Sequence, residues 1–188
     1  VIDSGITISD VDSTTLSAAT VSITGNLHTG EDVLAFTNNP ATMGNITASY
    51  NAGTGVMTLT SAGATATLAQ WQAALRSVTY TNSSDNPNTN NRTISFVAND
   101  GSTSSSAATK IVSVTAVNEA PQVTVPATIS VTEDVSSAIT GISFSDVDAG
   151  SSSVTVTLSV TSGSLVATSG GGVTIGGTSS ALTLTGSI

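Results

Sequence analysis

Apolar residues alternate with serine and threonine along most of the chain, and this pattern constrains the fold more than any other feature. Successive side chains of a strand point to opposite faces, so a period of two predicts strands with one buried and one solvated face. Short strands with regular turn signals indicate an antiparallel β-sandwich or barrel. We expect strands within residues 6–9, 19–24, 45–60, 77–81, 93–99, 110–117, 122–125, 128–132 and 153–160. Residues 45–60 form two such runs around a Gly-containing loop, which predicts a hairpin.

One segment departs from the alternation. Residues 67–77, TLAQWQAALRS, place their large apolar side chains at three- and four-residue spacing, which is typical of one face of a helix. Thr67 and Gln70 form a T-x-x-Q capping box at its start. We therefore predict one short helix over an edge of the sheet, with Trp71 in the core rather than exposed as a ligand platform.

An internal repeat organises the chain. The stretch GITISDVD at residues 5–12 returns as GISFSDVD at residues 141–148. Both copies end in two aspartates one residue apart. These pairs are Asp10 and Asp12 in the first copy, and Asp146 and Asp148 in the second.

A junction separates the two copies. The linker AVNEAPQV at residues 116–123 contains Pro121, which cannot donate to a sheet ladder and keeps its neighbour extended. We predict a first domain over residues 1–118 that lacks its opening strand, and the N-terminal part of a second over residues 119–188. Such an arrangement is expected in a longer tandem array.

The charge balance narrows the possible partners. Twelve acids stand against three basic residues, and the formal net charge is -9. That balance repels phosphate backbones and anionic lipid surfaces, so we expect no nucleic-acid partner, and no apolar run is long enough for membrane insertion. An excess of acidic residues favours divalent cations as binding partners. It has no cysteine, so neither a disulfide nor a thiolate metal site is available.

The repeated Asp-Val-Asp is the strongest candidate site. Residues i and i+2 of a strand project to one side, so Asp10 and Asp12 aim at one place, where calcium would relieve their repulsion. The alternative is an ordinary strand end in a solvated turn. The recurrence of Asp-Val-Asp at the same place in both copies favours metal binding over an ordinary strand end. Asp100 is predicted to serve a hairpin turn rather than a ligand set. Three further acids are predicted to be loop residues, namely Glu31, Asp32 and Asp85.

The order of these motifs resembles a known family. The run ISVTEDVSSAITGISFSDVDAGSSSVTVTL at residues 129–158 resembles the start of a cadherin repeat, and FVANDG followed by KIVSVTAVNEAP resembles its end. The Ser- and Thr-rich, lysine-poor composition is similar to that of cadherin-like tandem repeats in giant bacterial extracellular adhesins, type I secreted surface proteins of the RTX/VCBS kind. The resemblance implies tandem antiparallel β-sandwich repeats of the cadherin and immunoglobulin type.

The resemblance also implies a calcium-stiffened spacer on the cell surface, ligated at the repeat junctions and contacting neighbouring repeats or subunits. Carried over residue by residue, the metal ligands would be Asp146, Asp148, Glu119, Asn118, Asp10, Asp12 and Glu133. The sequence departs from the family in having fewer linker aspartates and no acid within residues 67–77.

Two alternatives belong to other classes of function. A glycan-binding module would need exposed aromatics, and the available ones, Trp71, Tyr50 and Tyr80, fall at predicted core positions. A filament subunit could instead assemble by donor-strand exchange through an unpaired edge near residues 5–10. We predict no enzymatic activity, because the single histidine, His28, lies in a predicted loop and no nucleophile motif accompanies it.

Overall fold

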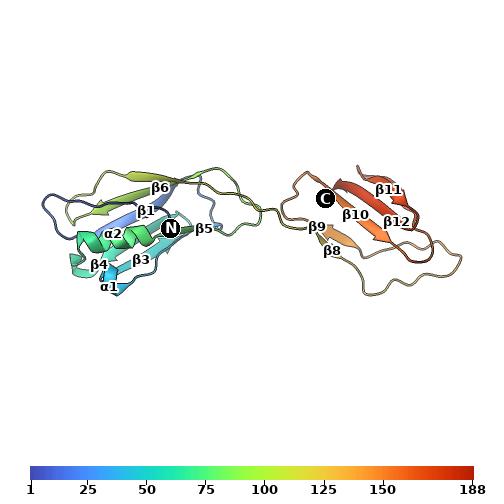
Figure 1. Cartoon of the computed structure of the whole chain (residues 1–188), viewed down its shortest axis with the longest axis horizontal. Coiled ribbons are helices and arrows are strands. Elements are labelled where there is room, and N and C mark those ends of the chain that lie inside the picture. Colours follow the sequence, from blue (N-terminus) through green and yellow to red (C-terminus); the bar gives the residue numbers. More distant parts are fainter. The chain divides into compact units, whose positions relative to one another are not determined.

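All residues from Val1 to Ile188 are described by a computed structural model, and nearly all of its regular structure is antiparallel β-strand (Figure 1). This confirms the predicted all-β sandwich class. The chain divides into two compact units, unit 1 from Val1 to Ala116 and unit 2 from Val117 to Ile188. The domain boundary predicted from the sequence falls two residues later, after residue 118.

Unit 1 is built on a five-stranded sheet with the order β3-β4-β1-β6-β7, and a separate pair, β2-β5. Its strands are β1 (Ala18–Gly25), β2 (Asp32–Ala35), β3 (Ile46–Asn51), β4 (Val56–Ser61), β5 (Thr79–Asn82), β6 (Arg92–Asn99) and β7 (Ala108–Val112). Alternation explains β1, since Ala19, Val21 and Ile23 are buried while the residues between them are more exposed. The predicted hairpin is β3-β4. Its turn ends at Gly55 with φ +68°, where an added Cβ would lie 2.9 Å from a methyl carbon of Leu27.

The predicted helix is α2 (Leu68–Ser77), and its capping box forms as expected. The Thr67 side chain accepts a hydrogen bond from the Gln70 backbone N–H, and Gln70 Oε1 accepts one from the Thr67 backbone N–H. Trp71 is fully buried, and its indole N–H donates to the Leu16 carbonyl at 3.0 Å. The prediction that Trp71 is a core residue is therefore confirmed.

The prediction of a single helix was incomplete. Unit 1 also contains α1 (Pro40–Met43) and a 3-10 turn, η1 (Ala62–Ala64). A signal for α1 exists in the sequence, because Asn39 caps the Ala41 N–H and Pro40 occupies the first helical position. None of the helices has both the length and the apolar composition needed to cross a bilayer.

Unit 2 has a three-stranded sheet with the order β10-β12-β11, and a two-stranded sheet, β8-β9. The bounds are β8 (Gln122–Thr124), β9 (Ser143–Ser145), β10 (Ser153–Ser159), β11 (Thr174–Thr178) and β12 (Ala181–Ser187). Its inward-facing residues are mostly half-buried, and Leu182, which is 8% exposed, is its one buried hydrophobic residue.

Three predicted strands differ from the structure. Residues 6–9 and 128–132 form no strand, and the strand expected over residues 110–117 ends at Val112. A partner is lacking in the first two cases. The Ile8 N–H donates to the Gln72 side chain instead of a neighbouring strand, and Ile129 and Val131 are exposed. Alternation creates an amphipathic strand face, but ladder pairing requires a second edge.

Candidate metal centre

Three carboxylates gather at one end of the unit 1 sheet. Asp10 and Asp12 follow the extended N-terminal segment, and Asp100 comes directly after β6. One oxygen from each lies within 4.8 Å of one oxygen from each of the others. Asp10 and Asp100 are half-buried, and Asp12 is exposed. The two aspartates predicted from the repeat therefore lie together, and a third joins them.

Local turns fix two of these side chains. Asp10 Oδ1 accepts hydrogen bonds from the backbone N–H groups of Asp12 and Ser13, at 3.1 and 2.9 Å. Asp100 Oδ1 accepts from those of Ser102 and Thr103, both at 2.7 Å. Aspartate commonly closes turns in this way. These hydrogen bonds fix the positions of the Asp10 and Asp100 carboxylates, and they do not require a bound metal.

The three carboxylates differ in proton affinity. Backbone hydrogen bonds, first from Ser13, lower the pKa of Asp10, and those from Thr103 and Ser102 lower the pKa of Asp100. The pKa of Asp12 is raised, because it shares a hydrogen bond with Asp10 and is repelled by the charges of Asp10 and Asp100. Neither ion pair of the chain involves this cluster. Its negative charge therefore has no cationic side chain as a direct partner.

Asp100 was predicted to be a turn residue and not a member of a ligand set. It does close a turn, but the pairing of β1 with β6 also brings it to the Asp10–Asp12 pair. Ala18 lies opposite Asn99 in this register, so the chain after β6 emerges beside the segment that leads into β1. The NDG motif predicted the turn at Asp100. The proximity of Asp100 to Asp10 and Asp12 depends instead on the β1-β6 register, which sequence pattern alone does not fix.

The second copy of Asp-Val-Asp repeats the local geometry of the first. Asp146 Oδ1 accepts from the backbone N–H groups of Asp148 and Ala149, at 3.3 and 3.0 Å. Asp10 makes the same bonds to the residues two and three positions after it. The repeated sequence therefore forms the same turn in both units.

The linker residues lie beside this second turn within unit 2. The Glu119 backbone N–H donates to Asp148 Oδ2 at 3.2 Å, and the Asn118 side chain donates to the Glu119 carbonyl at 2.6 Å. Asp148 Oδ1 is buried and accepts no hydrogen bond. Unit 2 holds no group of three carboxylates as close as that of unit 1. Glu133 lies on an exposed turn and takes no part in these hydrogen bonds.

A buried charge network that local sequence patterns did not predict lies at the β2-β5 pair. Asp32 was predicted to be a loop acid, but it begins β2 and is fully buried with Arg92, whose Nε lies 2.8 Å from Asp32 Oδ2. Tyr80 and Asn82 of β5 donate to Asp32 Oδ1 at 2.6 and 2.8 Å, and the His28 N–H donates to Oδ2 at 2.8 Å.

This network sets the ionisation of its members. Burial alone raises the pKa of Asp32, but the hydrogen bonds from Arg92, Tyr80, His28 and Asn82 outweigh it and lower that pKa to about 2. Burial and the bond to Asp32 raise the pKa of Tyr80 to about 12. Every donor points at a carboxylate that is already paired with Arg92, so we assign this network to structure rather than to ligand binding.

Comparison with known proteins gives one informative similarity. Over 86 residues, which is 45% of this chain, the sequence is 41% identical to halomucin of Haloquadratum walsbyi (strain DSM 16790 / HBSQ001). The matched region is 1% of halomucin, so this chain spans a very small part of that relative. No family model matches the chain. No solved structure matches it either.

Proposed function

We propose that this chain is a repeat module of an extracellular surface protein, and that it acts as a calcium-stiffened spacer in adhesion. The similarity to halomucin supports the surface-protein assignment. The repeated turn geometry in the two units supports a modular role. The proposal assigns no catalytic step to the chain.

The carboxylate cluster of Asp10, Asp12 and Asp100 is the observation that carries the calcium assignment. One oxygen from each carboxylate lies within 4.8 Å of one oxygen from each of the others, and the cluster has no cationic side chain as a direct partner. The donor set contains only hard oxygens, which calcium prefers, whereas zinc would favour the nitrogen and sulfur ligands that are absent here. Asp12 is the carboxylate most easily protonated, so proton competition would weaken binding first at this ligand.

A second set of ligands in unit 2 supports the stiffening role. Asp148 has a buried oxygen that accepts no hydrogen bond, and its other oxygen holds the Glu119 backbone. An ion bound between Asp146, Asp148 and the linker residues Asn118 and Glu119 would satisfy the Asp148 oxygen. It would also attach the start of the linker to the body of unit 2 and remove its freedom to move.

Calcium titration of the intact chain tests this proposal. A ligand that binds only the folded form adds about 2.7 kcal/mol of stability when its free concentration is a hundred times Kd. We therefore expect a higher Tm in calcium than in chelator, together with saturable heat in calorimetry. The triple variant Asp10→Asn, Asp12→Asn, Asp100→Asn should lose the unit 1 response, and the double variant Asp146→Asn, Asp148→Asn the unit 2 response.

Asparagine is a suitable replacement because its side-chain oxygen can still accept the turn hydrogen bonds. Asp85→Asn is the matched control, since Asp85 is an exposed acid outside both groups. It should leave the calcium response unchanged. An unmutated chain with the same Tm and no binding heat in calcium would contradict the proposal.

A further inference from the structure

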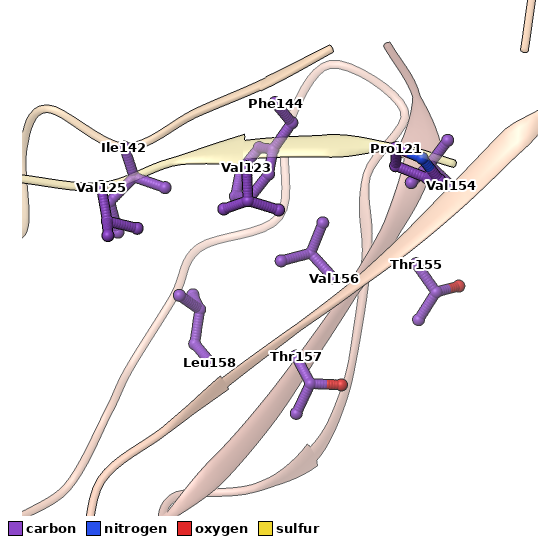
Figure 2. A pocket seen from close by; sticks show the side chains of 10 residues that line it. All are labelled: Pro121, Val123, Val125, Ile142, Phe144, Val154, Thr155, Val156, Thr157 and Leu158. Atoms are coloured by element: carbon purple, nitrogen blue, oxygen red, sulfur yellow. The ribbon is translucent and has the colours of Figure 1, made fainter. Parts of the chain in front are cut away.

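Unit 2 contains an open apolar groove between its two sheets. Figure 2 shows the side chains that line it, and its volume is about 260 Å³. The apolar lining comes from Val123, Val125 and Phe144 on one side and from Val154, Val156 and Leu158 of β10 on the other. Val123 and Val125 are more than half exposed, at 56% and 60%. The groove is thus a partly solvated core face rather than a finished core.

The sheet beside this groove has the same construction as part of unit 1. The order β11-β12-β10 reproduces β3-β4-β1, with each strand antiparallel to its neighbour. Val21 of β1 lies opposite Met57, and Val156 of β10 lies opposite Leu184. Strand β10 therefore occupies the place of β1, and its inward apolar residues occupy the place of a buried core row.

Unit 1 shows what completes such a sheet. The second edge of β1 pairs with β6, where Phe96 lies opposite Val21 and Ile94 lies opposite Ile23. Helix α2 adds the side chain of Trp71 to the same core. All of these residues are at most 5% exposed. In unit 2, β10 is an edge strand with no second neighbour, and no helix is present.

We propose that the groove of unit 2 and the free edge of β10 are a docking surface for an added helix and strand built like α2 and β6. An unpaired strand edge is a template for strand addition. The added strand would lie antiparallel to β10, with apolar residues opposite Val156 and Leu158 as Phe96 and Ile94 lie opposite their counterparts in unit 1. The helix would place a large apolar side chain in the groove.

This occupant fits better than a second copy paired through β10. Antiparallel pairing of two β10 strands would satisfy their edge hydrogen bonds, but it would bring no helix to the groove. The apolar side chains of the β8-β9 sheet, such as Val123 and Val125, would remain exposed. Completion of the core needs both the strand and the side-chain volume that Trp71 supplies in unit 1.

The test adds a synthetic peptide with the sequence of residues 67–100 to the intact chain, in chelator so that the result does not depend on the calcium proposal. We expect saturable binding of the labelled peptide, and amide exchange of β10 slowed at least tenfold at saturation. A control peptide with Trp71→Ser, Ile94→Ser and Phe96→Ser should bind at least tenfold more weakly.

Two variants of the chain locate the binding. Val156→Lys places a charge in the groove and should abolish binding, whereas Ser159→Lys, at an exposed position of β10 that does not line the groove, should preserve it. Exchange of β12 amides in the absence of peptide shows whether each variant keeps its sheet. The proposal would be overturned by absence of peptide binding, by binding that leaves β10 exchange unchanged, or by a dimer of the chain in which β10 is protected without peptide.

Discussion

Units 1 and 2 share a three-stranded arrangement but differ in how fully that sheet is covered. Unit 1 buries fifteen hydrophobic residues in one cluster, including Trp71 and Phe96, whereas unit 2 buries only Leu182. Both sheets come from the same alternation of apolar residues with Ser and Thr. The difference teaches that alternation produces a strand with one apolar face, whereas burial of that face requires further elements packed against it. In unit 1 these are helix α2 and strand β6.

Among these variants, Trp71→Ala should give the largest difference between the stability lost by unit 1 and that lost by unit 2. Removal of a buried Trp side chain costs about 3–5 kcal/mol, and here a hydrogen bond to the Leu16 carbonyl is lost as well. Hydrogen exchange should therefore show a large loss of protection in β1 and β6 and none in β12. Trp71→Phe should recover part of the loss. Equal effects on both units would show that they do not unfold separately.

The same Leu→Ala substitution can be compared in the two units. Leu59 of β4 is fully buried, whereas Leu184 of β12 is half-buried. Leu59→Ala should cost about 2–5 kcal/mol, and Leu184→Ala about 1 kcal/mol, because less apolar area leaves contact with the protein. Denaturant unfolding followed by exchange in each unit measures both. A cost for Leu184→Ala as large as that for Leu59→Ala would mean that Leu184 is as fully buried in solution as Leu59.

Acid should destabilise unit 1 through a group that unit 2 lacks. The folded-state pKa of Asp32 is about 2, below its value of about 3.9 in an unfolded chain. Its stabilising contribution, roughly 2 kcal/mol, is therefore present above pH 4 and is lost as the pH falls towards 2. The slope of unit 1 stability against pH in this range should become shallower in Asp32→Asn, where the lowered pKa values of Asp10 and Asp100 leave a smaller slope, and should be unchanged in Asp85→Asn. An unchanged slope in Asp32→Asn would contradict this assignment.

Local patterns in the sequence were enough to predict much of the fold. The hairpin β3-β4, strands β1, β6 and β10, and the Thr67-capped helix all follow from spacing within a few residues. Residues 128–132 have the same alternation, yet they form no strand. Their amphipathic pattern is local, but a ladder also needs a partner strand, which the pattern does not identify.

Part of the candidate metal site could also be predicted from local sequence patterns. The Asp-Val-Asp repeat predicted that Asp10 and Asp12 lie together, because they are two residues apart. The approach of Asp100 depends on the β1-β6 register, and the burial of Asp32 depends on Arg92, sixty positions along the chain. Long-range pairings such as these carry no signature in a short window of sequence. Calcium binding itself stays a prediction.

The burial of Arg92 with Asp32 also affects how copies of the molecule meet in solution. Lys110 lies 3.5 Å from Asp3, and the Arg76 guanidinium donates to the Ile6 carbonyl, so all three basic side chains have partners within unit 1. Unit 2 has five acids and no basic residue. Molecules approaching through unit 2 therefore present like charge to one another. This repulsion extends over about 8 Å at physiological ionic strength and about 3 Å in molar salt, so concentrated brine permits close lateral packing that dilute buffer opposes.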